Sequence, residues 1–251
     1  MSQGPRSSDH SKPGSAQFAT TAWSLIAAAG SRESPQAQAA LAELCQRYWY
    51  PLYAFLRRSG QNPDQASDSI QGFFAELLER SRLRVADPQR GRFRSFLLAS
   101  LKNYCANQRR REQALKRGGE RLTFSIDCTA GEERYGIEPQ NTLTPERLFE
   151  RKWALQLLER CLQRLEQEAV ERGRHKIFGA VKPFLSGLDA DVSYQQIADE
   201  HATTPSAVKV AVHRWRNRLR ELIRSEIAET VTTSEELNQE IEQLFSALSD
   251  E

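Results

Sequence analysis

The sequence contains few residues of the kind that build metal sites. It has four histidines and four cysteines, and the cysteines lie far apart, at Cys45, Cys105, Cys128 and Cys161. No CxxC pair occurs, and no histidine stands at metal-ligand spacing, which argues against a zinc site. We therefore expect thiols that are buried or idle, and neither a metal nor another cofactor.

Long apolar runs and enzyme signatures are also missing. No stretch approaches the ~18 to 20 apolar residues of a membrane span, and the polar, Ser-rich N-terminus lacks the apolar stretch of a signal peptide. These absences predict a cytoplasmic protein with no membrane partner. No HExxH motif, phosphate-binding P-loop or nucleophile elbow occurs either. The sequence therefore predicts a protein that is not an enzyme.

An excess of one charge sign is missing overall, but the charges are segregated along the chain. The 35 Lys and Arg residues nearly balance the 33 Asp and Glu residues, for a net charge of +2. Residues 80–121 contain thirteen basic and three acidic residues, and residues 205–224 contain six and one. Residues 225–251 contain eight acidic residues and no Lys or Arg. Two basic segments in a nearly neutral chain indicate local binding of a polyanion.

A helical pattern occupies most of the chain. Residues 1–19, rich in Gly, Pro and Ser, have too little apolar content to offset the entropy of ordering, and are predicted as a disordered tail. Residues 20–117 and 145–228 contain apolar residues at three- and four-residue steps, typical of helices. Residues 118–144 lose this period and are expected to form a linker. The predicted fold is all-α, with two small helical domains joined by a linker.

Three local features of the first predicted domain lead to separate structural predictions. Pro51 is expected to bend or interrupt its first helix, and Asp64 to cap its second. The third helix has Phe93, Phe96 and Tyr104 on its apolar face, which favours core packing. Alternatively, a ring exposed beside the basic face could stack on an unpaired base.

The most informative segment is residues 193–224. A short apolar face at Tyr194 and Ile197 is followed by a turn and a second helix, with Thr204 as predicted N-cap and Pro205 in its first turn. This is helix-turn-helix spacing, although Ala202 stands where the motif more often has glycine, so we expect a looser or differently shaped turn. The inward positions of the second helix are Val208, Val212, Trp215 and Leu219.

The outward face of this second helix admits two interpretations. Its basic residues could form only the solvated side of an amphipathic helix. A charge cluster on the second helix of a turn-punctuated pair is, however, typical of a recognition helix in the major groove of DNA. We favour the second interpretation.

The chain resembles the sigma-70 superfamily of RNA polymerase sigma factors, in particular its extracytoplasmic-function (ECF) group. SYQQIAD (193–199) and SAVKVAVHRWRNRLREL (206–222) resemble region 4, which recognises the promoter minus-35 element. QASDSIQGFFAELL (65–78) and RFRSFLLASLKNYCANQRRR (92–111) resemble the parts of region 2 that contact polymerase and the minus-10 element. The match departs at Gly72, where an acid is usual, and at Asn107, where Asp is common.

The resemblance implies a sigma region 2-like helical bundle, a sigma region 4-like helix-turn-helix and a set of binding residues for each partner. The implied minus-35 contacts are Ser206, Ala207, Lys209, Val210, His213, Arg214 and Arg216. The implied minus-10 contacts are Lys102, Asn103, Asn107, Arg109, Arg110 and Arg111. The implied polymerase contacts are Asp68, Gln71 and Phe74.

The resemblance also implies the partners. They are core RNA polymerase and promoter DNA, as duplex and in melted form. Whether an anti-sigma factor or another regulator also binds stays open.

The acidic C-terminal segment, residues 229–251, carries a separate signal. Thr233 followed by Glu236 is a capping box, which predicts an amphipathic helix over residues 234–248. Its apolar positions are Leu237, Ile241, Leu244, Phe245 and Leu248. The helix could pack on its own domain, or its acidic residues could shield the basic recognition helix until a partner displaces them.

Three other functions compete with the sigma-factor interpretation. A free-standing helix-turn-helix regulator would bind DNA without entering polymerase. A DNA- or RNA-processing enzyme lacks support from any catalytic motif, and a helical adaptor would leave the two basic clusters unexplained.

Overall fold

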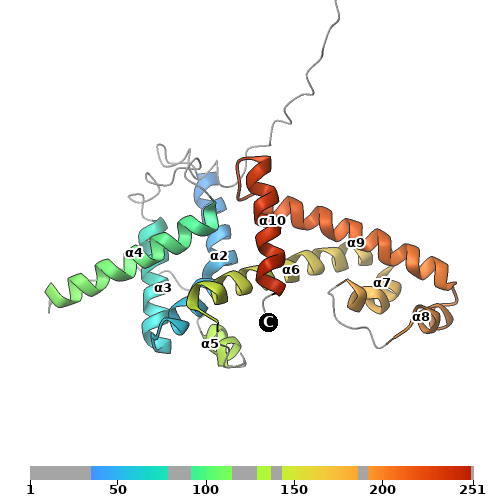
Figure 1. Ribbon diagram of the computed structural model, residues 1–251, viewed down its shortest axis with the longest axis horizontal. Coiled ribbons are helices and arrows are strands. Elements are labelled where there is room, and N and C mark those ends of the chain that lie inside the picture. Colours follow the sequence, from blue (N-terminus) through green and yellow to red (C-terminus); the bar gives the residue numbers. More distant parts are fainter. Residues whose placement is uncertain (1–34, 79–91, 115–128, 137–142, 186–191, 250–251) are drawn as a thin grey trace, which may run out of the picture.

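The computed structural model describes residues 35–78, 92–114, 129–136, 143–185 and 192–249. Helices make up most of these ranges, which contain no strand (Figure 1), so the all-α prediction is confirmed for them. The predicted tail at 1–19 lies outside the described residues. The helices are α2 Pro35–Arg58, α3 Pro63–Leu78, α4 Phe93–Ala114, α5 Thr129–Gly136, α6 Pro145–Glu171, α7 His175–Val181, the 3-10 helix η3 Lys182–Phe184, α8 Tyr194–Glu200, α9 Pro205–Ala228 and α10 Ser234–Ser249.

Of the local expectations for the first two helices, a break at Pro51 is excluded and the cap at Asp64 is wrong. Helix α2 continues through Pro51 without a break. Asn62 rather than Asp64 caps α3, because the Asn62 side chain accepts a hydrogen bond from the backbone N–H of Gln65 at 2.9 Å. The Gln65 side chain in turn accepts one from the backbone N–H of Asn62 at 3.2 Å. This reciprocal pair satisfies two donors at the start of the helix.

Helices α3 and α4 approach closely at Gly72. A Cβ atom at this position would lie 2.2 Å from the hydroxyl oxygen of Tyr104, far inside van der Waals contact. Tyr104 is 3% exposed, and its ring lies edge-on to Phe73. An acidic side chain therefore has no room here unless Tyr104 moves, which gives a packing reason for the glycine.

The predicted linker contains a helix, α5, that docks on α2. Glu132 of α5 accepts hydrogen bonds from the Arg57 guanidinium at 2.8 and 2.9 Å and from the Tyr53 hydroxyl at 2.7 Å. The carboxylate of Glu132 has a lowered pKa because of these bonds, chiefly the one from Arg57. A polar segment without clear apolar periodicity is thus held in place by charge.

Helix α6 joins the two predicted domains. It packs against α2, α9 and α10, and it runs through the middle of the molecule (Figure 1). Buried side chains from both predicted domains, among them Tyr48, Phe93, Trp153 and Leu222, belong to one continuous core. The division into two domains stays a prediction from the sequence.

The far end of α9 is tied to α2 by charge. Arg47 of α2 lies 3.2 Å from a carboxylate oxygen of Glu226 and 2.7 Å from one of Glu229. Arg160 of α6 approaches Glu226 to 3.6 Å. The middle of α2, the middle of α6 and the end of α9 are therefore fixed together.

The C-terminal helix α10 packs on its own chain. Its predicted capping box is present, since Thr233 accepts from the backbone N–H of Glu236 at 3.1 Å and Glu236 accepts from that of Thr233 at 3.3 Å. Leu237 and Leu244 are buried against α6 and α9. Phe245, predicted on the apolar face, is instead 55% exposed.

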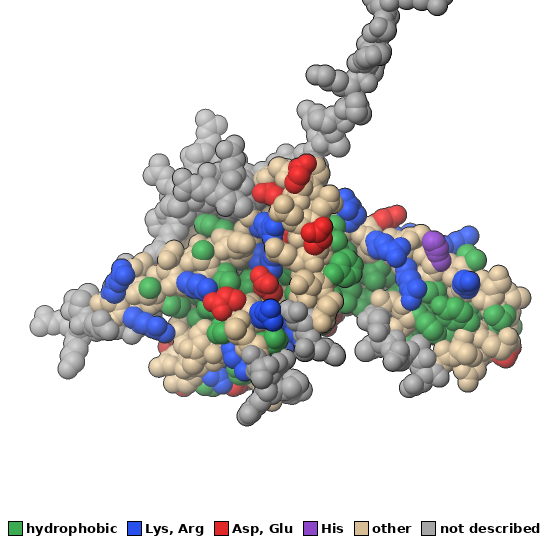
Figure 2. All heavy atoms as spheres, in the orientation of Figure 1, with side chains coloured by type: hydrophobic (Ala, Val, Ile, Leu, Met, Phe, Trp, Pro, Cys, Tyr) green, Lys and Arg blue, Asp and Glu red, His purple; other side chains and the backbone are tan. Residues whose placement is uncertain are grey.

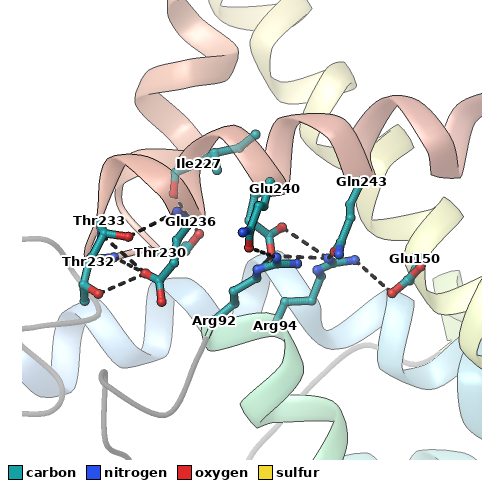
Figure 3. Close-up of polar contacts among 11 residues, drawn as sticks. Arg92, Arg94, Glu150, Ile227, Thr230, Thr232, Thr233, Glu236, Glu240 and Gln243 are labelled. Carbon is teal, nitrogen blue, oxygen red and sulfur yellow. Dashed lines mark hydrogen bonds and ion pairs between the residues drawn. The ribbon is translucent and has the colours of Figure 1, made fainter.

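A buried charge cluster holds α10 to α4. Glu240 is 2% exposed and lies 3.1 Å from the guanidinium of Arg92 and 3.2 Å from that of Arg94 (Figure 3). Arg94, 3% exposed, also pairs with Glu150 of α6 at 3.3 Å and lies over the Trp153 ring at 4.1 Å. This cluster links the first turn of α4 to α6 and α10 by paired, desolvated charges.

Burial of two cysteines agrees with the expectation of unreactive thiols. Cys45 and Cys161 are free and buried. Burial raises the pKa of both, that of Cys161 to about 12, so both are protonated at neutral pH. Cys105 is partly buried, also with a raised pKa, and Cys128 lies outside the described residues.

Replacing Gly72 by alanine should lower the free energy of unfolding by about 1–3 kcal/mol, because the new methyl group overpacks the contact with Tyr104. The loss should be smaller in a Tyr104→Phe background, which lacks the clashing oxygen. Urea denaturation measures the free energy of unfolding of the four proteins of this double-mutant cycle, namely wild type, both single variants and the double variant. Gly179→Ala in α7, where a Cβ meets nothing within 4 Å, is the control. Equal losses at both glycines would contradict the close approach.

Replacing Glu240 by alanine should lower the free energy of unfolding by about 3–5 kcal/mol, because the buried guanidinium of Arg94 and the partly buried one of Arg92 lose this carboxylate. Glu242→Ala, which removes the same charge from an exposed position of α10, should change it by about 0.5 kcal/mol or less. Denaturant melts of both variants test this. Similar small losses would show that the cluster is not a structural anchor.

Candidate nucleic-acid interface

The predicted helix-turn-helix is present as α8, a short turn and α9. Ser193 and Gln196 form a capping box at the start of α8. Thr204 caps α9 by accepting a hydrogen bond from the backbone N–H of Ala207, as predicted, and Pro205 occupies the first turn. Both helices therefore begin at side chains that satisfy their free N–H groups.

The turn between these helices adopts a left-handed conformation at Ala202, whose φ is +48°. The backbone N–H of Thr203 donates to the carbonyl of Ala198 at 2.9 Å, which closes the end of α8. Glycine would adopt this φ without cost. The turn therefore has the conformation that glycine favours, and alanine accepts it with some strain.

Helix α9 buries one face and exposes the other, as predicted. Val208, Val212, Trp215 and Leu219 are buried, and Trp215 lies edge-on to Phe178 of α7. All the predicted minus-35 residues are exposed, namely Ser206, Ala207, Lys209, Val210, His213, Arg214 and Arg216. Lys and Arg side chains gather along this helix at one end of the molecule (Figure 2).

Two arginines of α9 are held by neighbouring elements. Arg216 donates to the carbonyl oxygen of Phe184 at 2.9 and 3.2 Å, so it is directed toward η3. Arg218 makes a two-pronged contact with the Glu168 carboxylate of α6, at 2.7 and 2.9 Å. These contacts fix α9 relative to the helices behind it.

Helix α4 carries the second basic surface, at the opposite end of the molecule (Figure 2). Lys102, Asn103, Arg109 and Arg110 are exposed, and Asn107 is partly exposed. The side chain of Arg111 lies outside the description. Lys102 is paired with Glu146 of α6 at 2.6 Å, so a phosphate would have to compete with that carboxylate.

The aromatic residues of α4 pack in the core rather than facing a nucleic acid. Phe93 is 0% and Tyr104 3% exposed, and Phe96 is partly buried against the same core. Core packing is thus confirmed for Phe93 and Tyr104, neither of which can stack on a base.

The predicted polymerase surface on α3 is only partly accessible. Asp68 is exposed, and Gln71 is partly exposed with its amide 3.4 Å from the Ser67 hydroxyl. Phe74 is 0% exposed, packed in the core beside Phe73. The prediction that Phe74 contacts polymerase needs correction, because its ring is unavailable to a partner.

The acidic helix α10 does not cover the exposed start of α9. Its polar contact with α9 is between Asn238 and Arg224, at 3.5 Å, two turns beyond the last predicted minus-35 residue. Its buried acid, Glu240, faces α4 instead. The described contacts therefore favour packing on its own chain over shielding of the recognition helix.

Comparison with known proteins gives no match. No protein-family model, curated protein or solved structure matches this chain. Across the described ranges, no helix is both long and apolar enough to cross a membrane, and no three potential metal ligands converge. The functional assignment therefore depends on the residues and their geometry.

The sequence analysis did not predict a groove of about 730 Å³ beside α9. The turn between α6 and α7 forms one side of it and α9 the other. Arginines from both elements line it, together with hydroxyl groups of the helix-turn-helix: Arg172, Arg174, Arg214, Arg218, Thr204 and Ser206. The signal in the sequence is Arg-Gly-Arg at the end of a long helical pattern, where glycine commonly closes a helix.

The pairing of Glu168 with Arg218 predicts an acid-sensitive contribution to stability. Hydrogen bonds from Arg218 lower the pKa of Glu168 in the folded protein. The pair therefore stabilises the fold above the ordinary pKa of glutamate and loses this effect as the pH falls through the lowered pKa. Glu168→Gln should destabilise most near neutral pH and progressively less in acid.

Thermal melts of wild type and Glu168→Gln from pH 7 to pH 3 measure this difference. Glu171→Gln, in which an exposed carboxylate near the end of α6 is neutralised, is the control and should show no such trend. A constant difference for Glu168→Gln across the pH range would contradict an ionised pair.

Proposed function

We propose that this chain is a sigma factor of the extracytoplasmic-function type, which binds core RNA polymerase and directs it to specific promoters. The observation that carries the proposal is the helix-turn-helix α8–α9, with its capped second helix and exposed basic face. In this proposal α9 recognises the minus-35 element, with Lys209 and Arg214 in its first turns able to contact base edges.

The second basic helix supports contact with a second DNA element. In α4, Arg109 and Arg110 are exposed, and Asn103 offers an amide group for a base. This half of α4 and the α8–α9 turn lie at opposite ends of the long axis of the molecule (Figure 1). Two separated DNA-binding surfaces suit two separated promoter elements, with α4 binding and opening the minus-10 element.

The polymerase contact is assigned to the exposed part of α3. Asp68 and the partly exposed Gln71 remain the candidate residues, without Phe74. An anti-sigma factor or another regulator is not assigned a surface.

The decisive experiment mixes the full chain with core polymerase and maps transcript starts across a genome. The proposal expects new starts that share minus-10 and minus-35 sequences. Lys209→Ala and Arg214→Ala should each weaken binding of the complex to such a promoter by about 1–3 kcal/mol, roughly 5- to 150-fold, if the residue contacts a base. Arg220→Ala, an exposed arginine further along α9, is the control.

The same material separates this proposal from a free-standing helix-turn-helix regulator. A sigma factor should bind core polymerase, and Asp68→Arg should weaken that binding while leaving duplex DNA affinity unchanged. DNA binding without any effect of the chain on where core polymerase starts would contradict the proposal and favour the free-standing regulator.

A further inference from the structure

The groove beside the recognition helix has a rigid wall that carries positive charge. Helix α6 ends in a closed turn in which Gly173, with φ +66°, donates its N–H to the carbonyl of Val170 at 2.9 Å. Arg174 donates its backbone N–H to the carbonyl of Ala169 at 2.7 Å. These two bonds are those of a Schellman motif. Arg172 and Arg174 are therefore presented from a fixed backbone on either side of the glycine.

The charges around the groove are only partly balanced within the chain. Arg218 is paired with Glu168, and Arg172 lies 3.5 Å from the same carboxylate. Arg174 and Arg214 form no ion pair with another described residue. The described residues that line the groove include no Asp or Glu. On each side of the groove, one exposed arginine is thus without an ion pair to the described part of the chain.

The shape and the lining indicate the kind of anion. Arg172, Arg174 and Arg214 are all exposed, so none of these cations encloses a small ligand from a buried position. Ser206, Val210 and Arg214 line the groove and also belong to the face of α9 proposed to contact bases. A ligand in the groove would therefore continue directly into whatever α9 binds. A DNA strand at the edge of the major groove has this continuity and carries phosphates at regular spacing.

We propose that the α6–α7 turn and α9 form a clamp for the phosphodiester backbone that borders the major groove occupied by α9, with Arg172 and Arg174 as phosphate contacts. This inference depends on the proposed minus-35 function and adds to it a second DNA-binding element outside the helix-turn-helix. Its contacts are with phosphates and not with bases, so they contribute affinity and orientation but no sequence preference.

The test uses the complex of full chain and core polymerase on a labelled promoter duplex at several salt concentrations. The double variant Arg172→Gln/Arg174→Gln should bind on the order of tenfold more weakly, and equally so on a duplex with an altered minus-35 sequence. The slope of log affinity against log salt should become less negative by about 0.9 for each lost phosphate contact. As a control, Arg164→Gln/Arg220→Gln removes one exposed arginine from α6 and one from α9, both outside the groove, and should leave affinity and slope unchanged.

A third variant guards against a folding defect. Arg172→Lys/Arg174→Lys keeps both charges and should retain most of the salt slope, and thermal melts compare the stability of all variants. Different results would contradict the proposed clamp and the proposed sigma-factor function. The clamp alone would be overturned if the Gln variant kept the wild-type affinity and salt slope while the wild-type complex still selected promoters. A wild-type complex that selects no promoter would overturn both.

A small anion as the natural occupant is the remaining outcome. Inorganic phosphate that raises the melting temperature of the wild type but not of the Gln variant, with DNA affinity equal in the two proteins, would replace the clamp by a free-anion site.

Discussion

The structure depends on one buried carboxylate, that of Glu240, between two arginines at the start of α4. Without it, Arg94 would be a nearly inaccessible cation with only the partly exposed Glu150 as a charged partner. Three helices distant in sequence, α4, α6 and α10, meet at this cluster, which therefore links the first part of the chain to the last. Burial of the apolar core supplies most of the free energy that stabilises the fold, whereas the paired charges favour one arrangement of the three helices.

The elements best predicted from the sequence are those with local causes. The helix-turn-helix and α10 can be predicted from the sequence because capping residues such as Thr204 and Thr233 bond to backbone N–H groups within one turn of the helix. The prediction of the buried positions of α9 is also confirmed, because periodicity alone distinguishes the two faces of a helix. These features need no knowledge of what the rest of the chain does.

The features that were missed depend on partners far away in sequence. The resemblance implies that Phe74 contacts polymerase, but the packing of the helices around it buries its ring. Helix α5 lacks periodicity and is held by Arg57, whose pairing with Glu132 spans 75 residues. The groove beside α9 was invisible for the same reason, because its two walls come from separate helices.

The length of α9 gives the molecule a mechanical property. One uninterrupted helix runs from the solvent-facing helix-turn-helix to the junction where Glu226 meets Arg47 of α2. Its 24 residues span about 36 Å at 1.5 Å per residue. Such a rod behaves as a lever, because a tilt of about 5° at the junction would swing the far tip by roughly 3 Å, close to the spacing of neighbouring base pairs. Because Arg216 and Arg218 tie α9 to η3 and α6, such a tilt would move the helix-turn-helix together with the helices behind it.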